Sequence, residues 1–362
     1  MKAYTRDQIA IIKLLSVEEM GYRQRLALTQ LAQSPAELFD HLAAYRSEIT
    51  SLGDGLFDKL TDLQESFDEQ RFLLYMERIG AVVVFQGEEE YPDSLMILDD
   101  SPLALFCIGD VSLLKREDCF AVVGTRAPTR YGRDVTELFS KEIAEAGFPI
   151  VSGLARGVDA IAHRAALDAD APTIAVLGCG VDKVYPSENK DLYHRIAEKG
   201  LLVSEFFPGS EPLAFHFPHR NRVISALSKG VLVTEAGVKS GTLITVTDAL
   251  EQGKDVFIVP GNIFSQASKG ANEMLHNPQC LIATDPSDVL GFYGKDKTSK
   301  EVEPHQLTTE EVIIYSALQD DDKHFEELLA LTGLGMGELM ATLTKLEVLG
   351  VIKSYPGNYY GI

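Results

Sequence analysis

The sequence lacks the features that would place the protein in a membrane or outside the cell. No apolar run approaches the roughly 20 residues of a membrane helix, and the first residues show no signal-peptide pattern. The four cysteines, at positions 107, 119, 179 and 280, have no C-x-x-C spacing. These absences predict a cytoplasmic protein with reduced cysteines, no disulfide framework and no membrane partner.

Motifs for several kinds of chemistry are also missing. The turn that begins at Gly124 lacks G-x-G-x-x-G, which disfavours a dinucleotide cofactor. No serine occupies a G-x-S-x-G elbow, and no paired His/Cys spacing indicates a metal site. We therefore expect neither a cofactor nor a bound metal.

Positive charge is scarce. The chain has 33 Lys and Arg residues against 54 Asp and Glu residues, a formal net charge of −21. Such an excess of acid argues against a protein that coats nucleic acid by bulk charge. A phosphate-binding surface must therefore be a local concentration of arginine and lysine.

Strand and helix patterns alternate from residue 81 to about residue 292. This alternation predicts an α/β fold with a Rossmann-like, doubly wound, mostly parallel sheet. Several predicted strands are continuous apolar runs, as expected for a sheet covered on both faces. The predicted strands are 81–85, 104–108, 119–123, 148–152, 173–177, 201–205, 231–234, 256–259 and 280–283, and the predicted helices are 132–146, 157–169, 188–199, 219–229, 241–252 and 269–276.

Helical patterns flank this central region, which we delimit as 71–294. Residues 1–70 predict a small all-helical domain, which we interpret as a packing or oligomerisation module, with contact to the DNA backbone as the alternative. Residues 295–305 are polar and without periodicity, which predicts a linker. Residues 306–362 predict three short helices and a terminal hairpin, the outline of a winged helix.

The third helix of a winged helix can bind duplex DNA, but the domain at residues 306–362 has few cations to support such binding. Lys323, Lys345 and Lys353 are its only lysines and arginines, against nine Asp and Glu residues between Glu310 and Glu347. A helix that enters a DNA groove needs side chains around it that pair with phosphates. We therefore favour protein–protein contact or packing over duplex recognition for this domain.

Residues that suit anions follow the strands of the central region. Glycine, hydroxyl or amide groups occur there, nearly always with a cation nearby, and these loops share one edge of a parallel sheet. Glycine and arginine are common in loops generally, but that explanation covers one or two such loops rather than six. The candidate binding residues are Gly124, Thr125, Arg126, Arg130, Arg156, Lys183, Asn189, Lys190, His219, Arg220, Asn221, Arg222, Lys239, Ser240, Gly241 and Thr242.

This predicted rim suits a ligand with several phosphates in a row. Arginine pairs with phosphate oxygens bidentately and also stacks on bases. Four phenylalanines near His216 and His219 are candidates for stacking on unpaired bases, and burial in the core is the alternative for each. They are Phe206, Phe207, Phe215 and Phe217.

Two pairs of residues have the spacing of catalytic groups. Asp159 and His163 lie four residues apart on a predicted helix, either as a base with its orienting group or as a hydrogen bond that anchors the helix start. Glu205 and Glu235 end predicted strands, either as acid–base carboxylates or as buried partners of arginines. The sequence leaves both alternatives open.

The order of these motifs resembles the bacterial DNA-processing protein A family (DprA, also called Smf). The resemblance runs from about Tyr91 to Leu290, with weaker likeness to the family's SAM-like N-terminal domain and winged-helix C-terminal domain. It rests on Val123-Gly124-Thr125-Arg126, Ser152-Gly153-Leu154-Ala155-Arg156-Gly157, Tyr185-Pro186, Phe217-Pro218-His219-Arg220-Asn221-Arg222, Ser240-Gly241-Thr242 and Val259-Pro260-Gly261.

The resemblance implies a protein that is not an enzyme and that binds incoming single-stranded DNA during natural transformation. It also implies protection of that DNA, help in loading RecA recombinase, and a homodimer built from the Rossmann-like domain. Carried over by motif, the family's phosphate contacts fall on Arg126 with the Gly124–Thr125 turn, on Arg156, on Tyr185 to Lys190, on Arg220 and Arg222, and on Ser240 to Thr242. Ser187 and Ala214 are departures, because relatives often carry lysine at or near these positions.

A second family offers an alternative function. Rossmann-like proteins of the "lonely guy" type hydrolyse nucleoside monophosphates to free bases and use P-G-G-x-G-T-x-x-E. The matching stretch here runs from Glu235 to Thr245, and Thr245 stands where that family has its catalytic glutamate. The absence of that glutamate disfavours hydrolysis, so the alternative function is nucleotide binding, with or without hydrolysis of nucleoside monophosphates.

Overall fold

The computed structural model describes residues 3–295, 308–319, 321–348 and 351–361. The chain divides into two compact units, the first ending at residue 296 and the second beginning at residue 297. The predicted linker, 295–305, lies outside the described residues except for Lys295, and the predicted boundary near residue 70 stays a prediction. Within the described part of the chain, no helix is long and apolar enough to cross a membrane.

A nine-stranded sheet forms the centre of the first unit, in the order β1-β2-β6-β5-β4-β3-β7-β8-β9. The seven strands from β6 to β9 in that order run parallel, while β1 and β2 are antiparallel to their neighbours. This arrangement confirms the predicted α/β fold class. The strands are β1 (Ala81–Phe85), β2 (Ala104–Gly109), β3 (Phe120–Val123), β4 (Ile150–Ser152), β5 (Thr173–Val176), β6 (Leu201–Ser204), β7 (Gly230–Val233), β8 (Asp255–Ile258) and β9 (Cys280–Ile282).

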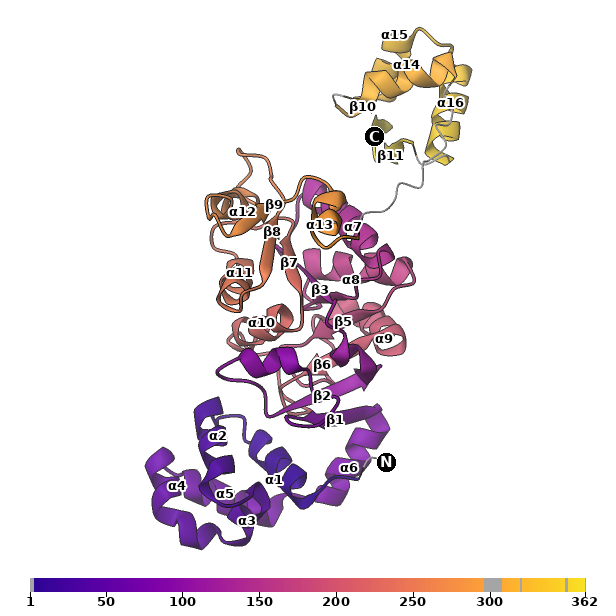
Figure 1. Ribbon diagram of the computed structural model, residues 1–362. Helices are drawn as coiled ribbons and strands as arrows, with labels where there is room; N and C mark the ends of the chain where they lie inside the picture. The colour runs from indigo at the N-terminus through magenta and orange to yellow at the C-terminus, as the bar shows by residue number, and fades with distance from the viewer. Residues whose placement is uncertain (1–2, 296–307, 320, 349–350, 362) are drawn as a thin grey trace. The chain divides into compact units, whose positions relative to one another are not determined.

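Helices cover both faces of this sheet (Figure 1). One face packs against α10 (His216–Ala226), α11 (Thr242–Glu251) and α12 (Lys269–Met274). The other face packs against α7 (Arg130–Glu145), α8 (Val158–Asp168), α9 (Lys190–Lys199) and α13 (Pro286–Phe292). The strands therefore bury both of their faces, which explains why their sequences are continuous apolar runs.

The direction of winding reverses beside β3. From β3 the chain builds β4, β5 and β6 on one side, and then α10 carries it back to β7 on the other side. The loops that follow β3 and β7 therefore leave in different directions from neighbouring strands. A doubly wound sheet binds its ligands in the crevice at such a reversal.

The N-terminal helices gather near the β1–β2 end of the sheet (Figure 1). Helix α1 joins them to the sheet, since Ile9, Ile12 and Leu15 pack in a core with β1 and β2 while Ala10 and Leu14 pack among the other N-terminal helices. The elements are α1 (Arg6–Leu15), α2 (Tyr22–Leu31), α3 (Pro35–Asp40), η1 (Leu42–Tyr45), α4 (Arg46–Leu52), α5 (Leu56–Ser66) and α6 (Glu69–Ile79).

The second unit has the winged-helix outline that the sequence predicts. Its helices pack around Ile314, Leu328, Leu339 and Leu343, and its small sheet has the order β10-β12-β11. The elements are α14 (Thr309–Leu318), β10 (Lys323–His324), α15 (Phe325–Thr332), α16 (Met336–Val348), β11 (Lys353–Tyr355) and β12 (Tyr359–Gly361).

Most predicted boundaries shift by one or two residues, and two helices of the first unit differ more. Helix α10 begins at His216 and not at residue 219, because Pro218 lies in the first turn, where a residue without N–H costs no helical hydrogen bond. Four predicted binding residues, His219 to Arg222, therefore lie inside the helix and not in its first three positions. Helix α13 was not predicted, although Asp285 caps it and Pro286 is its first residue.

Candidate nucleic-acid interface

The turn after β3 is held against the turn after β7. The amide of Thr125 donates to the carbonyl of Glu235 at 2.8 Å, and the amide of Val158 donates to the carbonyl of Thr125 at 3.2 Å. Gly124 permits this approach, because a Cβ atom there would lie 2.5 Å from the Val158 side chain and 2.9 Å from the Glu235 carbonyl oxygen. The turn is therefore fixed in place before any ligand binds.

The carboxylate of Glu235 anchors the start of α7. It is buried, and it accepts hydrogen bonds from the amide of Thr129 at 2.7 Å and from the hydroxyl of Thr129 at 2.9 Å. A Cβ atom at Gly132 would lie 2.3 Å from this carboxylate, so only glycine fits there. The carboxylate of Glu235 is thus held by the amide and hydroxyl of Thr129 and by the hydroxyl of Ser268 at 3.3 Å, and by none of the rim arginines among the described residues.

A cavity of about 760 Å³ opens at the reversal between β3 and β7. Arg126 and Lys239 line it, both are exposed, and neither has an ion-pair partner among the described residues. Ala214, one of the two departures from the family pattern, also lines it. The cavity brings together nine of the predicted residues, Gly124, Thr125, Arg126, Arg220, Asn221, Lys239, Ser240, Gly241 and Thr242.

An aromatic stack forms one wall of this cavity. The guanidinium of Arg126 lies 5.3 Å from the centroid of the Phe217 ring, and the rings of Phe217 and Tyr185 have centroids 5.4 Å apart. Gly178 gives Phe217 its room, since a Cβ atom there would lie 2.8 Å from the ring. A smaller cavity of about 60 Å³ on the other side of this wall includes Arg156.

Arg220 is buried and holds the sheet edge together. Its guanidinium donates to the carbonyl of Gly153 at 2.8 Å and also to the carbonyl of Val176. Burial lowers the pKa of Arg220 to about 10, with Asp159 nearby opposing the shift. Arg220 lines the cavity, but one of its terminal nitrogens is used by the two backbone carbonyls, and its Nε donates to the side-chain oxygen of Asn221 at 3.3 Å.

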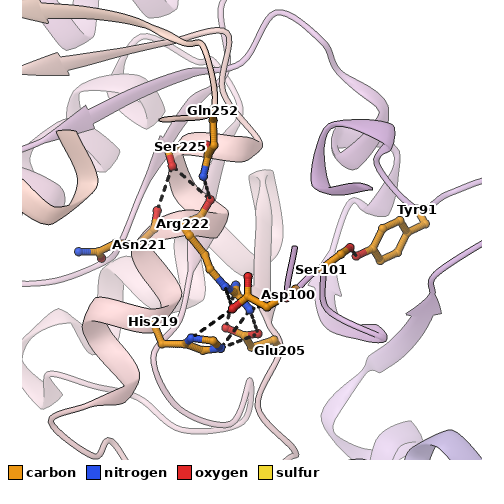
Figure 2. A network of polar contacts seen from close by, with 9 residues as sticks. All are labelled: Tyr91, Asp100, Ser101, Glu205, His219, Asn221, Arg222, Ser225 and Gln252. Carbon is orange, nitrogen blue, oxygen red and sulfur yellow. Dashed lines mark hydrogen bonds and ion pairs between the residues drawn. The ribbon is translucent and has the colours of Figure 1, made fainter. Parts of the chain in front are cut away.

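Arg222 is buried on the far side of α10 and is enclosed by acids (Figure 2). It donates to the carboxylate of Asp100 at 2.8 Å and to that of Glu205 at 2.7 Å. These partners raise the pKa of Arg222 against the opposing effect of burial. Glu205 is thus the buried partner of an arginine, one of the two alternatives from the sequence.

His219 belongs to the same cluster. Its two ring nitrogens lie 3.7 Å from Asp100 and 3.5 Å from Glu205, and Nε2 lies 3.0 Å from a guanidinium nitrogen of Arg222. Figure 2 shows the ring beside both carboxylates. The structure therefore does not bring His219 and Arg222 to the first cavity.

Several other predicted binding residues already have acidic or backbone partners in the protein. Arg156 pairs with Glu188 at 2.6 Å and Lys183 pairs with Glu211 at 2.6 Å, both at the surface. Arg130 lies 3.8 Å from Asp134 on the same helix. The side chain of Asn189 is buried and donates to the carbonyls of Leu154 and Ala155, which ties the loop after β5 to the loop after β4; Lys190 is exposed.

Asp159 and His163 do not form a base with its orienting group. His163 Nδ1 lies 2.7 Å from the hydroxyl of Thr173, which itself donates to the carbonyl of Ile150, while Asp159 accepts from the amide of Ala155. Burial lowers the pKa of His163 to about 3, so the ring is neutral. Asp159 anchors the start of α8 through the Ala155 amide, but among the described residues no hydrogen bond joins it to His163, so neither alternative from the sequence describes the pair.

Sequence reasoning missed residues that reach the site from far along the chain. Asp100 is separated from Arg222 by 122 positions, and no local motif marks it. Gln266 and Ala267 line the first cavity from the loop after β8, again without a local signal. Over the described ranges, no group of three or more His, Cys, Asp or Glu residues could hold a metal ion.

Comparison with known families identifies the central region. Residues 82–294 match the family model for DNA recombination-mediator protein A, and residues 298–358 match the model for the DprA winged helix domain. Protein Smf of Escherichia coli is 38% identical over 304 residues, covering 79% of each chain. Protein Smf of Synechocystis is 30% identical over 352 residues, covering 86% of this chain and 88% of that protein.

Solved structures agree with this assignment. The DNA processing protein A structure from Streptococcus pneumoniae superposes with a TM-score of 0.66 at 33% identity, covering 80% of this chain and 98% of that one. The Helicobacter pylori structure, described as a study of single-stranded DNA binding by DNA processing protein A, superposes with a TM-score of 0.55 at 33% identity over 60% of this chain and 96% of that one. The chain belongs to the DNA recombination-mediator protein A family, also known as DprA or Smf.

Proposed function

We propose that the protein binds single-stranded DNA in the cavity between β3 and β7, protects it, and helps to load RecA recombinase on it. One observation carries this proposal: a candidate phosphate-binding side chain lies directly against a candidate base-stacking ring. Arg126 is exposed and has no ion-pair partner among the described residues, and it stacks on Phe217. Arginine next to an aromatic ring suits a strand whose bases are unpaired.

The distribution of charge supports a local binding surface. The chain has a net charge of −21, but the first cavity is lined by two unpaired cations, Arg126 and Lys239, and by the Ser240–Thr242 turn at the start of α11. Backbone N–H groups at the start of a helix attract anions. Arg220, Arg222 and Asn189 have structural partners, so we assign them to holding the loops and not to phosphate contact.

The exposed side chains of the winged-helix unit support the proposal that it binds a protein partner. Its third helix, α16, exposes Met336 and Met340, which are 64% and 58% exposed, and its Lys345 pairs with Glu311 at 2.6 Å. Exposed methionines one turn apart suit an apolar protein contact better than a DNA groove. We assign this face to RecA.

We also propose that the protein acts as a homodimer. Strand β9 is one edge of the nine-stranded sheet, and its Ile282 is 58% exposed. An uncovered edge strand with an exposed apolar side chain suits pairing with a second copy. Light scattering should show a dimer, and Ile282→Asp should give a monomer.

Hydrolysis of nucleoside monophosphates is the alternative function. Thr245 lines the first cavity at the position where a lonely-guy hydrolase has its glutamate, and it is buried. A threonine hydroxyl does not ionise near neutral pH, so it cannot replace a carboxylate as general acid or base. Release of adenine from AMP is the assay that decides this alternative.

Titration of the protein against a fluorescent oligo-dT tests DNA binding. We expect affinity for oligo-dT above that for a duplex of equal length, because only unpaired bases can stack on Phe217. Equal affinity for the two, or no binding to oligo-dT, contradicts the proposal. A RecA strand-exchange assay with and without Met336→Glu tests the assignment of the winged helix.

A further inference from the structure

The loop between β8 and α12 carries two adjacent apolar side chains in water. Ile263 is 78% exposed and Phe264 is 87% exposed, the two highest values among the large apolar side chains that the structure describes. Single exposed apolar residues are common on protein surfaces, whereas adjacent large ones form a patch. Such a patch is typical of a binding surface.

Hydrogen bonds fix the tip of this loop. The side-chain oxygen of Asn262 accepts from the amide of Phe264 at 2.9 Å, and the carbonyl of Asn262 accepts from the amide of Ser265 at 2.9 Å. These two bonds close a four-residue turn with Ile263 and Phe264 at its centre. Because the turn is already ordered, a ligand that contacts it pays little backbone entropy on binding.

The base of the loop is fastened to a residue that also holds the first cavity. The side chain of Asn272 donates to the carbonyl of Gly261 at 3.0 Å and accepts from its amide at 2.9 Å. The hydroxyl of Ser268 donates to the carboxylate of Glu235 at 3.3 Å, the same carboxylate that anchors α7. The segments that follow β3, β7 and β8 therefore share one anchor, which fixes the loop beside the cavity.

The same loop forms part of the cavity wall. Gln266 and Ala267 line the first cavity, and Phe264 precedes Gln266 by two residues. A Cβ atom at Gly237 would lie 3.2 Å from the carbonyl oxygen of Gln266, so this wall lies against the turn after β7. A strand that leaves the cavity over Gln266 next meets the turn at residues 262–265.

The charge around the turn suits an anionic ligand. No aspartate or glutamate occurs at residues 236–247 or 256–272, although the chain has 54 of them among 362 residues. Lys239 and Lys269 are the charged residues of these two segments, and both are exposed. A DNA strand matches both features, since its bases suit the apolar side chains and its phosphates suit the lysines.

We propose that Phe264 is a second base-stacking point for single-stranded DNA, in addition to Phe217. This inference rests on the proposed function, because it needs a strand in the first cavity. Every base has a flat face, so a phenylalanine ring stacks on it whatever the sequence. Two stacking points on one cavity hold the strand more tightly than one and add no sequence preference.

Titration of the full chain with oligo-dT and with an abasic oligomer of equal length tests this assignment. Phe264→Leu keeps an apolar side chain but removes the flat ring, so we expect about fivefold weaker binding of oligo-dT, the lower end of the range for one stacked base, and unchanged binding of the abasic oligomer. Phe264→Trp restores a flat ring and should bind oligo-dT at least as tightly as the wild type. Because the ring is 87% exposed, urea unfolding of both variants should match the wild type.

Leu74→Ala is the matched control. Leu74 is 63% exposed on α6, which packs on β1, and β1 and β9 are the opposite edges of the sheet. Loss of an exposed apolar side chain at this distance from the cavity should leave the affinity for both oligomers unchanged. A loss as large as that of Phe264→Leu would show that the effect is not specific to the turn, and would overturn the proposal.

Three further results would also overturn it. They are wild-type affinity of Phe264→Leu for oligo-dT, an equal loss on the abasic oligomer, and a monomer in light scattering of Phe264→Leu where the wild type is a dimer, since a second copy would then cover the ring. Arg126→Ala and Phe217→Leu separate this inference from the proposed function. If they lose affinity and Phe264→Leu does not, only the second stacking point fails; if they too bind like the wild type, the proposed function fails with it.

Discussion

The guanidinium of Arg126 lies over the ring of Phe217, 5.3 Å from its centroid, and the ring of Tyr185 lies 5.4 Å from the same centroid. The contact holds an exposed cation against an aromatic surface, in a loop that hydrogen bonds to Glu235 already fix. A cation held in this way keeps donors available for a phosphate while the ring beside it offers a surface to a base. The proposed function therefore predicts that phosphate binding and base stacking are coupled at this contact.

Replacing Phe217 by leucine should weaken binding of oligo-dT by about 1–3 kcal/mol for each base that stacks on it. An abasic oligomer of the same length is the control, because it keeps the phosphates and lacks the rings. Wild type and Phe217→Leu should bind the abasic oligomer almost equally. An equal loss on both oligomers would show that the ring supports the loop and does not stack on bases.

If the protein binds DNA as proposed, Glu188 should compete with the DNA for Arg156. The two side chains form a surface ion pair at 2.6 Å, with exposed fractions of 62% for Arg156 and 49% for Glu188. Glu188→Gln should release the guanidinium and raise the affinity for oligo-dT several-fold at low salt. Asp168→Asn is the matched control, since it removes the same charge from a surface pair with Arg195, also at 2.6 Å. An equal gain in affinity for both variants would show that the effect comes from the change in net charge and not from the release of Arg156.

Arg222 should matter for stability and not for DNA contact. Arg222→Met leaves the buried carboxylate of Glu205 without its arginine, which should lower the free energy of unfolding by about 3 kcal/mol. Urea unfolding measures the loss, and adding Glu205→Gln should recover part of it. The salt dependence of oligo-dT binding should stay as in the wild type. If Arg222→Met instead showed a smaller salt dependence of oligo-dT affinity and an unchanged free energy of unfolding, Arg222 would be a phosphate contact.

Stability should depend on pH through His163. Burial lowers the pKa of His163 to about 3 in the folded protein, whereas an unfolded histidine titrates near pH 6.5. The unfolded chain therefore binds the extra proton first, so this contribution is complete above about pH 6.5 and is lost as the pH falls towards 3. His163→Gln cannot titrate, and its unfolding free energy should fall less than that of the wild type between pH 7 and pH 5. Equal slopes for the two proteins would contradict the buried neutral ring.

The strands were predictable because their cause is local. Val122 and Val123, like the apolar runs in the other strands, are buried on both faces of a parallel sheet, and such burial leaves a continuous signal in the sequence. The cavity was predictable for a related reason: parallel strands bring their following loops to one edge, whichever residues the loops contain. Gly124 to Arg126 and Ser240 to Thr242 therefore meet at the first cavity as the strand order requires.

The roles of the individual arginines were not predictable in the same way. Arg220 is buried because Gly153, 67 positions away, leaves room for its guanidinium, and Arg222 is paired because Asp100 arrives from the loop before β2. A motif shows that arginines are present but not which side of α10 each one occupies. These contacts are set by tertiary packing, and no local pattern carries them.

The dependence of oligo-dT affinity on salt, compared between the wild type and Arg126→Ala, tests the central claim most directly. Each phosphate contact to a single strand contributes a slope of about 0.7 in a plot of log affinity against log salt. We predict a clear salt dependence for the wild type, and for Arg126→Ala a weaker affinity with a slope smaller by about 0.7. Wild-type affinity and slope in Arg126→Ala, or binding that salt does not change, would contradict the assignment of Arg126 as a phosphate contact.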